Sequence, residues 1–257
     1  GECPACRIGH YPACKNLKLI GIDMDGGFGE YVAVPEDRLY TLDMNISNRE
    51  GALVEVLSIG FHASQRAEVK SGDRIAIWGA GKVGQCILQA VKTKTNQQVF
   101  LVDPLNKRLE MALKGYPDTI PINPEIENPV EKIIKKTKGN GVDIAFEAVG
   151  HAANIANVAH PVMSCVQSIR GAGKVVVLGL SDEPAPLVMK ELILKEGQII
   201  ASRVNHGEFR ETLQNLSEGK LKAENLITDE MPASSAQEGF RLLAEKPQNH
   251  LKILLAL

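Results

Sequence analysis

The sequence lacks long runs of charge of one sign. Its 29 basic and 31 acidic residues leave a net charge of −2 and are mixed along the chain. Nucleic acids and anionic membrane surfaces bind proteins through clustered cations, so the sequence indicates neither as a partner. The longest uncharged stretch, Ala148 to Ile169, is interrupted by histidine, asparagine, glutamine and proline. It predicts a buried helix with its flanks and not a membrane span.

The sequence also has no recognisable signal peptide, internal repeat or low-complexity segment. Only five of its 257 residues are cysteine. A disulfide scaffold is therefore not expected, and a reducing cytoplasm is the expected location. The length allows a full hydrophobic core and favours more than one domain. Because the chain begins Gly-Glu-Cys without an initiator methionine, we expect that an N-terminal portion is missing from it.

The most informative segment is a strand, a glycine turn, a helix and a second strand that ends at an acid. The strands are expected at 75–78 and 99–102, the helix at 85–92, and Asp103 follows the turn by 19 residues. The turn reads Gly79-Ala80-Gly81-Lys82-Val83-Gly84 and fits G-x-G-x-x-G. In a dinucleotide site the first glycine permits the tight turn, the second admits the diphosphate, and the third allows close helix packing. The helix N-terminus adds free N–H groups for the phosphates. A plain structural turn is the alternative.

Asp103 also bears on the choice of cofactor. A carboxylate at this position can accept hydrogen bonds from both hydroxyls of an adenosine ribose. A 2′-phosphate there would meet like charge, at about 4 kcal/mol per charge pair for a separation of about 4 Å and an effective dielectric of about 20. NAD is therefore favoured over NADP. Arg108 could soften this discrimination, stack on the adenine, or be a solvated helix charge.

Strands and helices alternate from about residue 58 to residue 203, as a parallel sheet requires. Further strands are expected at 119–122, 142–149, 174–180 and 198–203, with helices at 107–114 and 129–136. Six strands with helical crossovers predict an α/β fold with a doubly wound parallel sheet.

The two ends of the chain do not follow this alternation. Residues 1–57 are rich in loops, with a short strand expected at 29–34. Residues 204–257 contain two expected helices and a terminal strand at 251–255. We expect both ends to form one further domain, with the nucleotide-binding domain inserted between them.

Three cysteines near the start, Cys3, Cys6 and Cys14, have the spacing C-x2-C-x7-C. Thiolates two residues apart on a turn can chelate one metal ion, and a structural zinc site uses four such ligands. The fourth ligand could be His10 or a residue before Gly1. The alternative is three free cysteines in a frayed terminus.

These features occur in one order along the chain. The cysteine segment is followed by Asp-Gly-Gly-Phe-Gly-Glu-Tyr-Val at 25–32, Gly-Ala-Leu-Val-Glu-Val-Leu-Ser at 51–58 and the glycine turn. Together they resemble the zinc-containing medium-chain alcohol dehydrogenase superfamily, most closely its sorbitol and polyol dehydrogenase-like branch. The resemblance covers nearly the whole chain and implies a Rossmann sheet inserted into an incomplete, β-rich GroES-like catalytic domain. The implied domains are the remainder of the catalytic domain with a structural-zinc lobe (1–57), the NAD-binding domain (58–203) and a return to the catalytic domain (204–257).

The resemblance also implies where the zinc ligands lie. In the structural-zinc lobe of the family, Cys3, Cys6 and Cys14 would be joined by a cysteine immediately before Gly1, which explains the fourth ligand better than His10. The ligands of the catalytic zinc, a cysteine and a His-Glu pair, would also lie upstream. We therefore expect a C-terminal fragment of the enzyme.

Several site residues follow from the resemblance by position. Glu55 would lie near the catalytic zinc; its alternative is a helix N-terminal carboxylate stabilised by the helix dipole. Arg203 would reach the substrate; its alternative is a plain salt bridge. The residues implied beside the cofactor are Val83, Leu178, Gly179, Leu180 and Ser202, in addition to the glycine turn.

The implied reaction is reversible hydride transfer between a secondary alcohol and NAD, with zinc binding the substrate hydroxyl and lowering its pKa. A polar pocket with Glu55 and Arg203 favours a polyol, sugar or sugar acid, and the family is usually dimeric or tetrameric. Two other hypotheses stay open: a catalytically incompetent NAD-binding fragment and a zinc-free quinone reductase-like enzyme. The cysteines and Asp103 count against the second of these.

Overall fold

A parallel sheet forms the centre of the molecule. The computed structural model describes residues 1–150 and 160–256. Its six-stranded sheet has the order β3-β2-β1-β4-β5-β6, with every neighbouring pair parallel. The strands are β1 (Ile75–Trp78), β2 (Val99–Val102), β3 (Ile120–Ile122), β4 (Val142–Glu147), β5 (Ile169–Val177) and β6 (Gln198–Ala201). The strand order reverses between β1 and β4, so the doubly wound fold expected from the sequence is confirmed.

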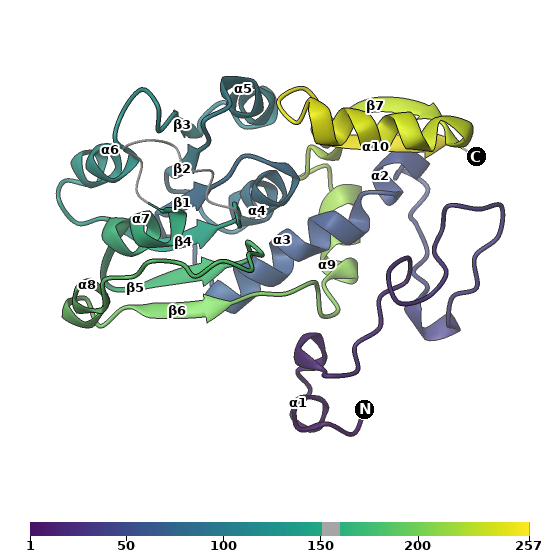
Figure 1. Ribbon diagram of the computed structural model, residues 1–257, viewed down its shortest axis with the longest axis horizontal. Coiled ribbons are helices and arrows are strands. Elements are labelled where there is room, and N and C mark those ends of the chain that lie inside the picture. Colours follow the sequence, from purple (N-terminus) through teal and green to yellow (C-terminus); the bar gives the residue numbers. More distant parts are fainter. Residues whose placement is uncertain (151–159, 257) are drawn as a thin grey trace.

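Helices cover both faces of this sheet (Figure 1). One face packs against α3 (Val54–Ala67), α4 (Lys82–Lys92) and α5 (Asn106–Gly115) through the hydrophobic cluster that contains Ile77, Leu101 and Phe146. The other face packs against α6 (Pro129–Lys136), α7 (Pro161–Ser168) and α8 (Met189–Leu194) through a cluster that contains Trp78 and Phe100. Strands β1 and β2 are buried at every position, which explains their uninterrupted apolar sequences.

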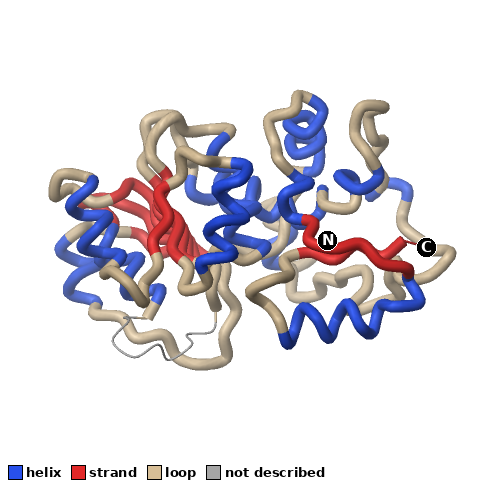
Figure 2. Tube along the Cα trace, turned by 90° about the horizontal axis from the view of Figure 1, so that it is seen from above, coloured by secondary structure: helices blue, strands red, loops and turns tan. Residues whose placement is uncertain are grey.

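The C-terminal residues form a smaller unit beside the sheet, and Figure 2 shows its two strands, near the label C, apart from the six-stranded sheet. Its elements are α9 (Phe209–Ser217), η3 (Ala223–Leu226), β7 (Ile227–Pro232), η4 (Ala233–Ser235), α10 (Ala236–Glu245) and β8 (Lys252–Ala256). Strands β7 and β8 pair in parallel. A third hydrophobic cluster joins this unit to the sheet domain, because Leu57 and Phe61 of α3 pack with Leu213 and Leu216 of α9.

The N-terminal residues are mostly loop, with α1 (Pro4–Arg7), η1 (Tyr11–Ala13), η2 (Glu36–Arg38) and α2 (Asn48–Gly51). The strand expected at 29–34 was wrong: this segment is irregular. Tyr31 is 92% exposed, and within the described part of the chain no strand pairs with it. A strand without a neighbour leaves its backbone hydrogen bonds unmade, so the alternating sequence alone does not form one.

Three other expectations differ from the structure or are only partly described by it. The sixth strand ends at Ala201 and not at residue 203. The fifth begins at Ile169, earlier than expected, with an irregular register against β4. The helix expected between residues 148 and 169 begins at Pro161, and residues 151–159 lie outside the described part of the chain. Within the residues described, no helix has the length and apolar character needed to cross a membrane.

Candidate functional site

The glycine turn between β1 and α4 differs in geometry from one glycine to the next. Gly79 has φ +98°, a conformation that favours glycine. A Cβ on Gly84 would lie 1.7 Å from the Gly79 carbonyl oxygen, so only glycine lets α4 begin this close to the strand. Gly81 has an ordinary φ of −71°, and the nearest atom to an added Cβ would be Arg108 Nη1 at 3.6 Å. The second glycine therefore faces space that a ligand can enter.

Helix α4 begins directly at this turn, with Gly81 at its N-cap and no side-chain capping bond in the described structure. Its first intrahelical bond runs from the Gln85 amide to the Gly81 carbonyl. The preceding amides of Lys82, Val83 and Gly84 have no carbonyl acceptor within the helix. Open amides at a helix N-terminus favour an anion, so the turn fits the diphosphate of a dinucleotide.

Asp103 lies behind the turn, at the end of β2. Its side chain is nearly buried, at 4% exposure. One carboxylate oxygen accepts from the Ala80 amide at 2.7 Å and the other from the Leu105 amide at 2.8 Å. Burial raises the pKa of Asp103, and the two amides and Arg108, whose Nη1 is 3.8 Å away, oppose this shift. A carboxylate oxygen accepts more than one hydrogen bond, so ribose hydroxyls can still bind.

A cavity of about 490 Å³ opens between the turn and the C-terminal unit. Its polar lining contains Lys82, Arg108, His250 and Lys252, and Gly81 and Val83 also line it. No aspartate or glutamate belongs to the lining among the described residues. The apolar part of the lining includes Phe28, Phe240, Leu243 and Leu255. A cavity lined by cations, with no acid among the described residues of its lining, is suited to a ligand that carries phosphate groups.

The loops after β4 and β5 meet at the same edge of the sheet. The amides of Leu178 and Gly179 donate to the Glu147 carbonyl. A Cβ on Gly179 would lie 2.2 Å from the Gly150 nitrogen, so the two loops approach at a point that only glycine allows. Leu180 follows with its side chain 84% exposed. The three residues 178–180 thus lie at the carboxyl edge of the strands, where ligands of this fold bind.

Ser202 lies at the end of the neighbouring strand β6. Its amide donates to Val177 O, and its buried hydroxyl has no hydrogen-bond partner among the described residues. Buried hydroxyls are normally satisfied, so this oxygen is available to a ligand or a water molecule.

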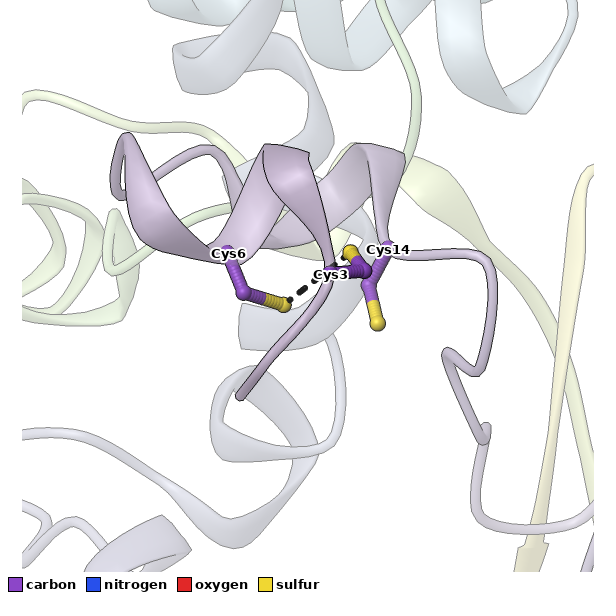
Figure 3. Close-up of side chains that lie close together, drawn as sticks. All are labelled: Cys3, Cys6 and Cys14. Carbon is purple, nitrogen blue, oxygen red and sulfur yellow. Dashed lines mark hydrogen bonds between the residues drawn. The ribbon is translucent and has the colours of Figure 1, made fainter.

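The three N-terminal cysteines come together on α1 and the turn after it (Figure 3). Their sulfur atoms all lie within 4.8 Å of one another, and Cys3 Sγ is 3.5 Å from Cys6 Sγ. Hydrogen bonds from the backbone of Cys6 and Lys15 lower the pKa of Cys3 to about 6. Interaction with Cys14, together with burial and Cys3, raises the pKa of Cys6. A divalent cation would relieve the repulsion among these thiolates, so the cluster fits zinc, with one tetrahedral position left for another ligand.

The chain matches the family described as Zinc-binding dehydrogenase over residues 83–218. It is 33% identical over 254 residues to an uncharacterized zinc-type alcohol dehydrogenase-like protein of Haemophilus influenzae. The matched region covers 98% of this chain and 71% of that protein. The chain belongs to the zinc-binding dehydrogenase family. The resemblance inferred from the sequence motifs is thereby confirmed.

Other dehydrogenases are similar over a comparable length. Sorbitol dehydrogenase of Bacillus subtilis is 28% identical, over 99% of this chain and 70% of that protein. Among solved structures, the rspB alcohol dehydrogenase of Escherichia coli CFT073, complexed with NADH, superposes with a TM-score of 0.89 at 26% identity, over 100% of this chain and 74% of that one. The 2R,3R-butanediol dehydrogenase of B. subtilis gives 0.88 at 27% identity, over 97% and 70%.

In this zinc-binding dehydrogenase the two expected catalytic residues lie outside the cavity lining. Glu55 is exposed in the first turn of α3, the position that the dipole alternative describes. Arg203 is exposed, and its Nη1 donates to the Pro12 carbonyl at 3.3 Å. Arg203 therefore joins the end of β6 to the cysteine lobe. This contact is a hydrogen bond to backbone and not the salt bridge considered as its alternative.

Sequence reasoning did not identify Lys252 and His250, which line the cavity from the far end of the chain. One signal was available: Lys252 is the only charge in the otherwise apolar strand 251–255. A lone cation in a partly buried apolar strand points to a partner or a ligand. His10, considered as a fourth zinc ligand, lies instead with its ring centre 6.5 Å from that of His206.

Proposed function

We propose that this protein is an NAD-dependent, zinc-type dehydrogenase that oxidises a secondary alcohol of the polyol, sugar or sugar-acid class. The observation that carries this proposal is the cavity beside the glycine turn, which combines open helix amides with three basic side chains and has no acid among the described residues that line it. Relatives of the chain include sorbitol, (R,R)-butanediol and L-idonate 5-dehydrogenases, whose named substrates are alcohols with neighbouring hydroxyl groups.

The proposed roles divide the site into a binding part and a reacting part. When bound, NAD supplies the hydride acceptor and a catalytic zinc polarises the substrate hydroxyl. Gly81 and the amides of residues 82–84 would hold the diphosphate, with Lys82 and Lys252 balancing its charge. Asp103 would accept the adenosine ribose hydroxyls, and Arg108, 3.8 Å away, would balance its charge.

At the carboxyl edge of the sheet, Leu178, Gly179, Leu180 and Ser202 would confine the nicotinamide. The Ser202 hydroxyl, which has no partner among the described residues, would hydrogen bond to the cofactor. Confinement of the ring fixes the distance over which hydride moves, and this distance strongly affects the rate.

Glu55 and Arg203 are the proposed substrate-side residues. The Glu55 carboxylate is exposed and free to face a polar substrate. Arg203 would have to release the Pro12 carbonyl before its guanidinium could bind a substrate oxygen. Cys3, Cys6 and Cys14 would hold a structural zinc that stabilises the N-terminal lobe.

A second candidate is NAD binding without turnover. It is supported by the position of the metal-ligand cluster: within the described residues the only group of three or more ligands is the cysteine cluster, and none of its members lines the cavity. A zinc-free quinone reductase-like activity is less well supported, because it explains neither this cluster nor Asp103.

Two measurements test the proposal. Titration of the protein with NADH, followed by nucleotide fluorescence, should give saturable binding that is stronger than binding of NADPH. Sorbitol, butanediol and idonate, each with NAD, should then be assayed by absorbance of the NADH formed. Saturable NADH binding without product would favour the second candidate, and absence of NADH binding would refute both.

The proposal extends to the assembly and its location. Strand β6 is an edge strand with Ile199 40% exposed, and α8 beside it exposes Ile193 and Leu194. Unpaired edges with apolar side chains favour pairing with another copy. We expect a homodimer through this edge, or a tetramer built from it, which light scattering will measure. The described cysteines are all free, which suits a cytoplasmic protein.

A further inference from the structure

The cavity lining includes an acid–histidine pair that the sequence motifs do not indicate. His250, in the loop between α10 and β8, lines the cavity together with Lys82, Arg108 and Lys252. Its Nδ1 lies 2.6 Å from Asp229 Oδ2 on β7. The His250 side chain is 13% exposed and that of Asp229 is 33% exposed. The ring is therefore largely enclosed, and its contact with Asp229 fixes one of its two nitrogens.

The loop that carries His250 is attached to both neighbouring elements. On the α5 side, Arg108 Nε donates to the Pro247 carbonyl at 3.1 Å and Lys107 Nζ donates to Asn249 Oδ1 at 2.8 Å. On the β7 side, the Leu251 amide donates to the Thr228 hydroxyl at 3.2 Å. Figure 1 shows the same arrangement, with the end of α10 and its loop beside α5. These contacts hold the imidazole in the cavity lining with little freedom to move.

We propose that His250, oriented by Asp229, is a cofactor-binding residue that donates from Nε2 to a phosphate oxygen of the bound dinucleotide. With Nδ1 directed to the carboxylate, Nε2 is the nitrogen left for a ligand. The carboxylate and the phosphate are both acceptors, so each ring nitrogen faces a group to which it can donate. Lys82, Arg108 and Lys252 are the other charged groups that face the ring in the cavity, and each of them also attracts an anion.

This role differs from that of the two lysines. Long, flexible side chains supply charge but lose rotamer freedom on binding. The imidazole is enclosed and already oriented, so its hydrogen bond adds direction to the recognition of the diphosphate. The inference rests on the proposed function, because it assumes that the cavity binds a dinucleotide.

Substitutions at one position separate the two ring nitrogens. His250→Asn keeps a donor near Nδ1 for Asp229 but removes Nε2, so NADH binding should weaken about tenfold, the scale of one hydrogen bond to a charged group. His250→Gln places an amide nitrogen near Nε2 and should recover part of this loss. Asp229→Asn, which keeps an acceptor without the charge, should weaken binding by roughly threefold. The control is His206→Gln, because His206 contacts Tyr11 and does not belong to the described cavity lining.

A footprint on the unmodified protein tests the inference even if a variant does not fold. Diethyl pyrocarbonate modifies accessible histidine rings, and mass spectrometry of the peptides reports each site. ADP should protect His250 while leaving His206 reactive, and adenosine should not protect His250. Equal protection by adenosine, or unchanged NADH affinity in a folded His250→Asn variant, would overturn the inference while leaving the proposed function intact. If the unmodified protein failed to bind NADH, the proposed function itself would fall, and the inference with it.

Discussion

Alanine substitutions at Gly81 and Gly84 test the nucleotide site. Gly81→Ala should weaken NADH binding and leave the stability nearly unchanged, whereas Gly84→Ala should destabilise the protein itself. A Cβ at Gly81 would meet only the end of the Arg108 side chain, at 3.6 Å. Its φ of −71° is also ordinary for alanine. Alanine reduces the freedom of the unfolded chain, which favours folding by about 0.4–1 kcal/mol. It is also a poorer N-cap than glycine, by a similar amount. The free energy of unfolding of Gly81→Ala should therefore stay within about 1 kcal/mol of the wild type, or about 4 °C in Tm for a chain of this size.

NADH binding, in contrast to stability, should change strongly in Gly81→Ala. The added methyl group would occupy the space through which a diphosphate reaches the backbone. Overpacking of this kind costs about 2–3 kcal/mol, which lowers affinity by roughly 30- to 150-fold. Gly84→Ala is the matched variant: its Cβ would lie 1.7 Å from a backbone oxygen, so the protein itself should be destabilised by 3 kcal/mol or more, on the order of a severe core clash.

Thermal unfolding and NADH fluorescence titration measure both effects in the same samples. If Gly81→Ala bound NADH as tightly as the wild type, the diphosphate could not lie against this turn, and the assignment of the cavity would be wrong.

Three further predictions follow from the charges of the molecule. Lys252→Met should weaken NADH binding about tenfold and reduce its dependence on salt, whereas Lys190→Met, on the exposed surface of α8, should change neither. Zinc binding at neutral pH should release a proton from Cys6, whose pKa is raised, and calorimetry in buffers of different ionisation enthalpy that found no release would contradict the site. Burial raises the pKa of Glu208, but hydrogen bonds from His62 and the His206 amide outweigh it, so the pKa lies below its ordinary value. Stability from Glu208 is therefore present above the unfolded-state pKa of about 4.3 and lost as pH falls through the folded value. The difference in stability between Glu208→Gln and the wild type should therefore shrink as pH falls through the folded pKa of Glu208, and a difference that stayed constant would refute this.

The sheet was predictable because its strands are buried on both faces. The bounds expected for β1, β2 and α6 agree with the structure, since apolar runs and the Asn128-Pro129 helix start act over a few residues. The strand predicted at 29–34 was wrong because a strand needs a neighbouring strand to pair with, and the sequence does not identify that neighbour.

The residues of the candidate site also differ in whether local sequence or the tertiary fold determines their position. The roles of Gly79, Gly81 and Gly84 in the turn follow from local geometry, so the motif was informative. Lys252 and His250 reach the cavity only because the chain returns beside the turn, and no local pattern carries that information. The contact of Arg203 with Pro12 was hidden for the same reason.

Helix α3 belongs to two hydrophobic clusters at once. Ala63 and Ala67 pack under the central sheet, while Leu57 and Phe61 pack against the C-terminal unit. A cut of the chain after residue 203 would leave Leu57 and Phe61 uncovered and invite aggregation of the piece that remained. The two units are therefore expected to unfold together in one cooperative transition.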